Sequence, residues 1–150
     1  MERIHYSCED FLKDARELTK KIGWEFDAII AIARGGMSLA HLLGEYYDLR
    51  SVYTINTIGY DDTRKRDRVQ VFNVPQLDDA KSVLVVDDIV DSGDTLIEVL
   101  AHLQAKYPQI EYKTASLFYK KSAKIAPTWY VNEADAWIDF FWSVDLKGKK

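Results

Sequence analysis

The chain has 150 residues, 47% of them hydrophobic and 29% charged, a composition typical of one globular domain with its own core. The formal net charge of −4 excludes a general attraction to nucleic acid or acidic membranes. A single cysteine, Cys8, excludes an internal disulfide and a zinc site of paired cysteines, and no apolar run has the length of a membrane span. We therefore expect a cytoplasmic protein without an integral membrane segment.

The first half of the chain alternates patterns that are typical of helices and strands. Residues 9–22 carry one apolar stripe and predict a helix, which Ser7 is placed to cap. The run Ala28–Ala33 predicts a strand buried on both faces, and the apolar spacing over residues 39–46 predicts a helix after it. Residues 51–57 are rich in β-branched side chains and predict the next strand. This alternation predicts an α/β fold with a mostly parallel sheet flanked by helices.

A turn of one arginine and two glycines, Arg34-Gly35-Gly36, directly follows the first of these strands. Two glycines between a strand and a helix allow positive φ angles and a close approach of the backbone to a ligand, while Arg34 adds a cation. On its own, so short a glycine motif is more simply explained as a tight turn with a solvated arginine.

Residues 59–68 are polar and charged, without apolar periodicity, and they include Arg64 and Arg66. One explanation is a solvated loop or hairpin, with residues 69–74 as the returning strand. The other is a mobile lid that closes over a polyphosphate and excludes water. Taken alone, the charge run favours the solvated loop.

The most specific pattern lies between residues 83 and 96. Val83–Val86 predicts a strand buried on both faces, Asp87 and Asp88 follow at its carboxyl end, and the apolar spacing from residue 96 onward predicts a helix. Between them lies a turn of small or capping residues, Asp91-Ser92-Gly93-Asp94-Thr95. A strand, a short polar turn and a helix present backbone N–H groups and the positive end of a helix dipole to an anion. The turn lacks the lysine of a Walker A loop, which excludes a nucleotide-triphosphate P-loop.

The adjacent carboxylates of Asp87 and Asp88 lie on a strand, so we expect their side chains to point to opposite faces and to avoid close repulsion. A vicinal diol suits such a pair, because each hydroxyl donates a charge-assisted hydrogen bond to a carboxylate oxygen. A diol beside a phosphate describes a ribose 5-phosphate. A lone Asp-Asp pair, by contrast, is more often a capping feature of a βα turn.

The last third of the chain combines a further strand, lysines and aromatic side chains. Residues 112–119 predict a strand, which leads into Lys120, Lys121 and Lys124. Residues 129–142 are rich in tryptophan, tyrosine and phenylalanine, interleaved with acidic residues. These rings either pack a small subdomain or stack on a flat heterocycle. The acidic surroundings argue against a polynucleotide and suit a free base.

Several of these patterns resemble one family. The aliphatic run with Asp-Asp, two aliphatic residues and Asp-Ser-Gly-x-Thr resembles the phosphoribosyl pyrophosphate (PRPP) signature of the type I phosphoribosyltransferases. The Ala-Arg-Gly-Gly turn resembles the pyrophosphate loop of the purine enzymes, and the charge run matches the position of their flexible loop. Trp137-Ile138-Asp139 resembles the purine-stacking segment of the bacterial xanthine-guanine phosphoribosyltransferases. The resemblance implies a single type I domain over residues 1–150, with a small C-terminal aromatic hood at about residues 120–145.

The resemblance implies how PRPP binds. Asp87 and Asp88 would hold the ribose hydroxyls, the turn from Asp91 to Thr95 would wrap the 5-phosphate, and Asp91 would also act as general base near the purine. Pyrophosphate contacts are implied for Arg34, Gly35, Gly36 and either Arg64 or Arg66. The implied cofactor is Mg²⁺, which would bridge pyrophosphate and ribose oxygens, with Asp88 and Asp139 as candidate ligands.

The resemblance also implies the contacts of the base. Lys120, with Lys121 as the fallback, would hydrogen-bond the exocyclic oxygen at position 6 of a purine, and Trp137 would stack on the ring. The backbone carbonyl of Ile138 would accept from a 2-amino group. Related purine enzymes have an aspartate six residues past the stacking ring, and this chain departs from them with Ser143 at that place.

We therefore expect a purine salvage enzyme, a pentosyltransferase that moves the 5-phosphoribosyl group of PRPP to guanine, xanthine or hypoxanthine. Its expected partners are PRPP and a free purine base, without nucleic acid, and the resemblance implies a homodimer or homotetramer. Two alternatives stay open. One is a non-catalytic regulator that binds PRPP or a nucleotide on the same fold, and the other is a phosphoribosyltransferase for another base.

Overall fold

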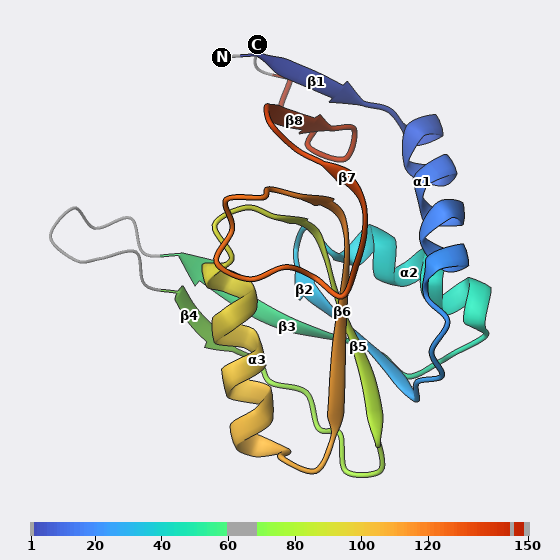
Figure 1. Ribbon diagram of the computed structural model, residues 1–150, viewed down its shortest axis with the longest axis vertical. Coiled ribbons are helices and arrows are strands. Elements are labelled where there is room, and N and C mark those ends of the chain that lie inside the picture. Colours follow the sequence, from blue (N-terminus) through green and yellow to red (C-terminus); the bar gives the residue numbers. More distant parts are fainter. Residues whose placement is uncertain (1, 60–68, 145, 149–150) are drawn as a thin grey trace, which may run out of the picture.

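The computed structural model describes residues 2–59, 69–144 and 146–148 of the chain. A six-stranded sheet with the strand order β4-β3-β2-β5-β6-β7 forms its centre, and a separate two-stranded sheet pairs β1 with β8 (Figure 1). The strands are β1 (Arg3–Tyr6), β2 (Ala28–Ala33), β3 (Val52–Gly59), β4 (Val69–Phe72), β5 (Ser82–Val90), β6 (Glu111–Tyr119), β7 (Trp129–Glu133) and β8 (Trp137–Phe140). The helices are α1 (Cys8–Lys21), α2 (Met37–Tyr47) and α3 (Asp94–Lys106).

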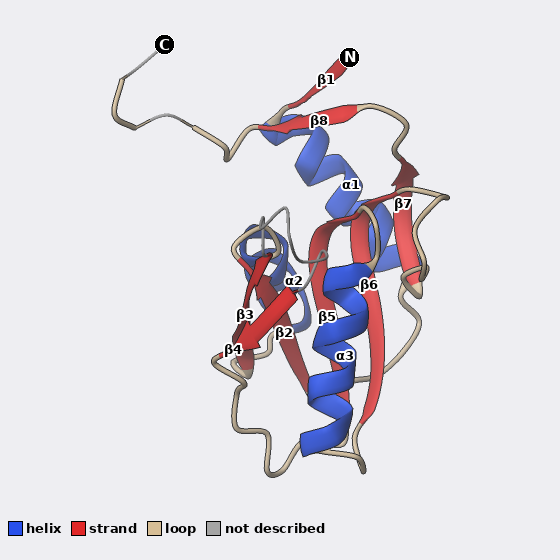
Figure 2. Ribbon diagram, turned by 90° about the vertical axis from the view of Figure 1, so that its left-hand side faces the viewer, coloured by secondary structure: helices blue, strands red, loops and turns tan. Residues whose placement is uncertain are grey.

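The central sheet is parallel except for its edge strand β4, which runs antiparallel to β3. Helices α1 and α2 cover one face of the sheet and α3 covers the other (Figures 1 and 2). Alternate residues of the buried strands therefore enter two separate cores. Ile29 and Leu84 pack on the side of α1 and α2, whereas Ile30 and Val85 pack on the side of α3. This arrangement confirms the predicted α/β fold with a mostly parallel sheet flanked by helices.

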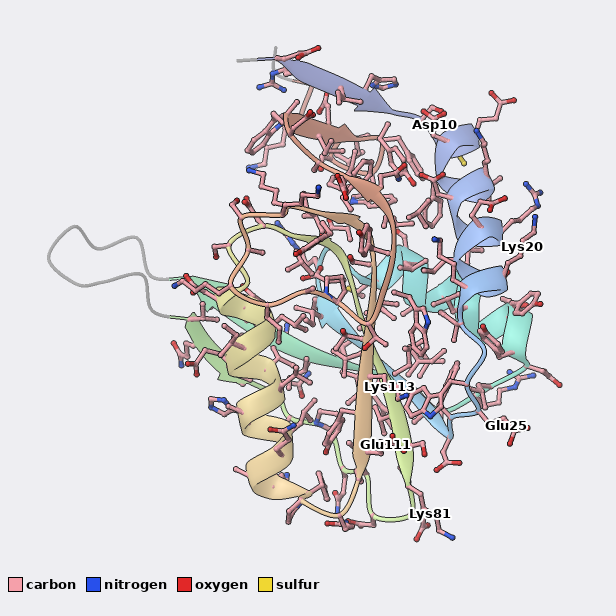
Figure 3. All side chains as sticks on the ribbon, viewed as in Figure 1. Asp10, Lys20, Glu25, Lys81, Glu111 and Lys113 are labelled. Atoms are coloured by element: carbon pink, nitrogen blue, oxygen red, sulfur yellow. The ribbon has the colours of Figure 1, made fainter. Side chains whose placement is uncertain are left out.

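The predicted cap of the first helix is present. The hydroxyl of Ser7 accepts from the backbone N–H of Asp10 at 3.0 Å, and the carboxylate of Asp10 accepts from the N–H of Ser7 at 3.1 Å. Such a reciprocal capping box contributes about 1 kcal/mol to helix stability. Figure 3 labels Asp10 at one end of the molecule and Lys81 and Glu111 at the other. The carboxyl ends of the parallel strands point toward the end that contains Asp10.

The aromatic hood is a two-stranded parallel sheet that unites both ends of the chain. Strand β1 pairs with β8 in the register Arg3 with Trp137 and Tyr6 with Phe140. The sequence interpretation placed the hood in residues 120–145 and missed β1. It also did not separate β7, which belongs to the edge of the central sheet beside β6. The hood therefore needs residues from both termini to form.

A hydrogen-bonded carboxylate holds the hood on the core. Tyr6 is buried, and its ring centroid lies 4.9 Å from that of Phe118 and 5.6 Å from that of Phe140. Its hydroxyl donates to Asp14 on α1 at 2.8 Å, and the side-chain amide of Asn132 on β7 donates to the same carboxylate at 2.8 Å. These contacts fix the orientation of β1, and hence of β8, relative to the central sheet.

Candidate active site

The residues singled out in the sequence converge at the carboxyl ends of the parallel strands, beneath the hood (Figure 1). The Arg34–Gly36 turn follows β2, the acid pair Asp87–Asp88 lies within β5 near its carboxyl end, and Lys120 follows β6. Open α/β sheets bind ligands at this edge because each βα turn there contributes backbone and side-chain groups. Strand β5 continues through Asp87 and Asp88 to Val90, so the acid pair belongs to the strand itself.

The turn after β2 borders a cleft with both signs of charge. The cleft has a volume of about 750 Å³ and is lined by Arg34, Gly35, Ser38, Asp88, Trp142, Ser143 and Val144. Arg34 is exposed, and the peptide bond that joins it to Ala33 is cis. The cleft thus offers an exposed cation, backbone groups and a carboxylate to a ligand that carries both phosphate and hydroxyl groups.

The turn approaches β5 so closely that Gly36 has no room for a side chain, and Gly35 has room for one only if the side chain of Asp88 moves. A Cβ at Gly35 would lie 2.5 Å from a carboxylate oxygen of Asp88, and a Cβ at Gly36 would collide with the backbone carbonyl of Val86. Neither glycine has a positive φ. The sequence interpretation allowed for a positive φ or a close approach, and only the close approach applies, with β5 as the neighbour. The turn is therefore held against the acid pair.

Gly36→Ala is expected to lower the free energy of unfolding by about 1–3 kcal/mol, because the added methyl group meets backbone that has no room to move. For a chain of this size, each kcal/mol lowers the Tm by about 2–4 °C. Thermal unfolding measures the effect. Gly23→Ala is the matched control, since a Cβ there meets nothing within 4 Å. Equal Tm values for the two variants would contradict the packing argument.

The acid pair is held in an environment that disfavours two negative charges. Asp87 and Asp88 are half-buried. Burial raises the pKa of Asp87 well above its usual range, and the charge of Asp88 adds to that effect. Burial also raises the pKa of Asp88. We expected the two carboxylates to avoid close repulsion by pointing to opposite faces, but the charge of Asp88 still contributes to the raised pKa of Asp87.

No cation in the described part of the chain forms an ion pair with either member of the acid pair. One internal contact is present, in which the backbone N–H of Asp88 donates to the carboxylate of Asp87 at 2.8 Å. The remaining carboxylate oxygens suit a ligand with several hydroxyl donors, because each donated hydrogen bond stabilises the charged form.

The turn after β5 leads into the N-terminus of α3 and is held in place by contacts with the segment around Lys124. Gly93 is the N-cap of α3 with a φ of 92°, and a Cβ there would lie 3.1 Å from the backbone nitrogen of Lys124. The backbone N–H of Lys124 donates to the carbonyl of Ser92 at 2.9 Å. Its ammonium group lies 2.7 Å from Asp94, and this hydrogen bond lowers the pKa of Asp94. The sequence interpretation named Lys124 only as a lysine near a strand end and missed this contact.

A second cavity of about 380 Å³ lies between the turn after β5 and the hood. It is lined by Arg3, Ile89, Asp91, Lys120, Ala136, Trp137, Ile138, Asp139, Phe140 and Ser143. Within it, the ammonium group of Lys120 lies 3.0 Å from the carboxylate of Asp91. The cavity therefore brings together Asp91, Lys120, Trp137 and Ile138, all of which the sequence assigned to the base. We call it the base pocket.

The aromatic segment serves two purposes that the sequence could not separate. Phe140 and Trp142 stack at 4.9 Å between ring centroids, and Trp142 lies edge-on to Phe11 at 5.1 Å. These rings pack the hood. Trp137, in contrast, is 54% exposed and lines the base pocket, where its ring is available to a flat ligand.

The remaining predicted site residues are not gathered in one cavity. Lys121 lies 3.7 Å from Glu133 and lines a further cavity that Asp91, Lys120 and Trp137 also border. Asp88 and Asp139 line different cavities, and the described residues contain no cluster of three His, Cys, Asp or Glu side chains around a common point. Arg64 and Arg66, together with most of the expected flexible loop, lie outside the described residues. Their assignment stays a prediction, as does that of Asp139 to a metal.

Sequence and structure comparisons extend these observations over the whole chain. A family model described as "Phosphoribosyl transferase domain" matches residues 2–149. The chain belongs to the phosphoribosyltransferase family. This confirms the family inferred from the PRPP signature. A xanthine-guanine phosphoribosyltransferase of Idiomarina loihiensis is 30% identical over 145 residues, which cover 93% of this chain and 86% of that protein.

Solved structures of phosphoribosyltransferases superpose closely on this chain. The xanthine-guanine-hypoxanthine phosphoribosyltransferase of Helicobacter pylori is 47% identical, with a TM-score of 0.89 and coverage of 97% of both chains. A purine phosphoribosyltransferase from Pyrococcus horikoshii is 27% identical, with a TM-score of 0.83 and full coverage of both chains. Among the described helices of this phosphoribosyltransferase, none is long and apolar enough to span a membrane.

Proposed function

We propose that this phosphoribosyltransferase transfers the 5-phosphoribosyl group of PRPP to a 6-oxopurine in purine salvage, releasing pyrophosphate and a nucleoside monophosphate. The observation that carries the proposal is the base pocket. There a lysine ammonium group, a carboxylate 3.0 Å from it and an exposed tryptophan line one cavity, together with Ile89, the residue that follows the acid pair in β5. The named relatives described above support the same activity.

The polarity of the pocket favours a 6-oxopurine over adenine. An ammonium group only donates hydrogen bonds, so Lys120 suits a carbonyl oxygen at position 6 and opposes an amino group there. Ile89 and Trp137 supply apolar surface on the same cavity for the two faces of a flat ring. Asp91, whose carboxylate lies 3.0 Å from Lys120, would accept the proton of the purine nitrogen N7.

The residues of the cleft suit the PRPP half of the reaction. The acid pair would hold the two ribose hydroxyls, and the N-terminus of α3 would bind the 5-phosphate. Arg34 and the backbone of its turn would neutralise pyrophosphate as it leaves the anomeric carbon. Asp91 would take the proton from N7 of the purine as N9 forms the new bond to the anomeric carbon. Positioning and charge neutralisation then supply most of the rate acceleration.

The residues present fit Mg²⁺ delivered together with PRPP. Asp88 provides a hard carboxylate oxygen in the cleft that contains Arg34, and Mg²⁺ needs few protein ligands because it retains waters and substrate oxygens. When bound, the ion would neutralise part of the charge of pyrophosphate. Asp139 is the weaker candidate ligand, since it lies 4.0 Å from Arg3 in the base pocket.

The test is a direct assay with PRPP, Mg²⁺ and each of guanine, xanthine, hypoxanthine, adenine, orotate and uracil. We expect nucleotide formation with 6-oxopurines and a rate with adenine at least about 100-fold lower, because an amino group at position 6 would meet the donors of Lys120 with another donor. PRPP binding by calorimetry accompanies the assay. Binding without consumption of any base would identify a non-catalytic regulator, and turnover of orotate or uracil alone would identify an enzyme for another base.

A further inference from the structure

The N-terminal strand forms one wall of the base pocket. Strand β1 pairs in parallel with β8, and the backbone N–H of Trp137 donates to the carbonyl of Glu2 at 3.1 Å. This pairing sets Arg3 directly beside Trp137 in the register of the hood. Arg3 therefore lines the same cavity as Asp91 and Lys120, although these residues follow strands of the central sheet.

The guanidinium group of Arg3 is available to a ligand. Its carbon atom lies 5.9 Å from the centre of the Trp137 ring, and one of its nitrogens lies 4.0 Å from a carboxylate oxygen of Asp139. The side chains of Arg3 and Asp139 are 66% and 46% exposed, so water screens their attraction. Because the Arg3–Asp139 contact is long and exposed to water, little energy is lost when either side chain turns to bind a ligand instead.

The two walls of the pocket meet opposite parts of a purine. In the proposed function, Lys120 and Asp91 on the central-sheet wall bind the edge that carries the oxygen at position 6 and the nitrogen N7. A purine held by that edge directs its position 2 toward the hood wall, where Arg3 and Asp139 lie. The three 6-oxopurines differ only at position 2, which bears an amino group in guanine, an oxo group in xanthine and a hydrogen in hypoxanthine.

We propose that Arg3 is a specificity-determining residue that donates to the 2-oxo group of xanthine. A guanidinium only donates and a carboxylate only accepts, so xanthine takes its partner from Arg3 while the amino group of guanine takes its partner from the acceptors of β8. Hypoxanthine uses neither. The Arg3–Asp139 pair thus allows one pocket to take both kinds of 2-substituent. This inference rests on the proposed function and names the residue that extends it to xanthine.

A purely structural role of Arg3 predicts a different pattern. The contact of its guanidinium with Trp137 would steady the stacking ring for every base alike. Selectivity among bases, and not the overall activity, therefore separates the two roles. Arg3→Met keeps most of the apolar stem against Trp137 but removes all donors. Arg3→Lys keeps a donor and the charge.

The experiment measures kcat/KM of the full chain and its variants with xanthine, guanine and hypoxanthine. Arg3→Met is expected to lower the value for xanthine by about 10-fold or more, the usual loss of a hydrogen bond to a charged group, and to change that for hypoxanthine by less than about 3-fold. Arg3→Lys should restore most of the xanthine activity. Arg16→Met, on the exposed surface of α1, is the matched control and should alter none of the three.

Binding of the product nucleotides by calorimetry gives a second measurement that does not need turnover. The xanthine nucleotide should lose affinity in Arg3→Met, while the hypoxanthine nucleotide should not. An equal fall for all three bases, or a parent protein that uses guanine and hypoxanthine but not xanthine, would overturn the role of Arg3. A parent protein inactive with all three bases would instead overturn the proposed function.

Discussion

The double variant Asp87→Asn with Asp88→Asn is expected to lose measurable PRPP binding and yet to unfold at a higher temperature than the parent at neutral pH. The loss of binding follows because amides cannot supply the charge-assisted acceptors that hold ribose hydroxyls. Asparagine preserves the shape of each side chain, so the fold is retained. The two effects have opposite signs because the same burial that serves the ligand destabilises the free protein.

The gain in stability follows from the raised pKa of both carboxyls. Burial is the largest cause for each, and the charge of Asp88 adds to it at Asp87. Between the unfolded and folded pKa values the native state binds more protons than the unfolded state, so stability falls as the pH rises through that window. The full penalty is present above the raised values and absent below the ordinary value of about 4. The advantage of the amide variant should therefore shrink as the pH is lowered.

Thermal unfolding between about pH 4 and pH 8 and calorimetry with PRPP and Mg²⁺ measure the two effects. Each kcal/mol gained raises the Tm by about 2–4 °C. The matched control is Asp78→Asn with Asp79→Asn, another adjacent pair, which is exposed in the segment before β5. It should bind PRPP as the parent does. Undiminished binding heat in the Asp87/Asp88 variant would end the assignment of the acid pair to the ribose.

The features predicted correctly from the sequence are those determined by short stretches of chain. The run Val83–Val86, the acid pair and the turn to Thr95 are contiguous, so their local pattern already contains the strand, the turn and the helix. The capping box at Ser7 is equally local. Because the parallel strands end at one edge, the order of these motifs along the chain also predicted that they would meet there.

The features that were missed depend on contacts between distant segments. Strand β1 has only four residues, and its partner β8 lies near the other end of the chain. The alternation of Ile4 and Tyr6 with polar neighbours was the available signal, but a pattern this short is weak. The role of Arg3 in the base pocket depends entirely on that pairing. The Lys124–Asp94 contact likewise required the position of the segment after β6 against α3.

The aromatic segment illustrates the same limit within a single stretch. Composition identified residues 129–142 as unusual, but only the three-dimensional arrangement separates the rings that pack the hood from Trp137, which faces the pocket. Phe140 and Trp142 contact Tyr6 of β1. Because the sequence interpretation did not include this strand, it could not explain why these two residues are aromatic.

Asp91→Asn is expected to lower kcat by about 100-fold or more, within the range that general acid–base catalysis usually contributes. The amide oxygen still accepts a hydrogen bond from Lys120, which lies 3.0 Å from the native carboxylate, so the lysine remains in place for the base. What the variant loses is the ability to take the proton of the purine as the new glycosidic bond forms. PRPP affinity should change little, because the acid pair and Arg34 are untouched.

Turnover at saturating PRPP and base, together with PRPP binding by calorimetry, separates a catalytic loss from a binding loss. A distant carboxylate, Asp79, exposed near the opposite end of the sheet, supplies the control Asp79→Asn, which should retain the activity of the parent. Turnover of Asp91→Asn equal to that of the parent would remove Asp91 from the mechanism, and the proton would then have to leave the purine directly to water.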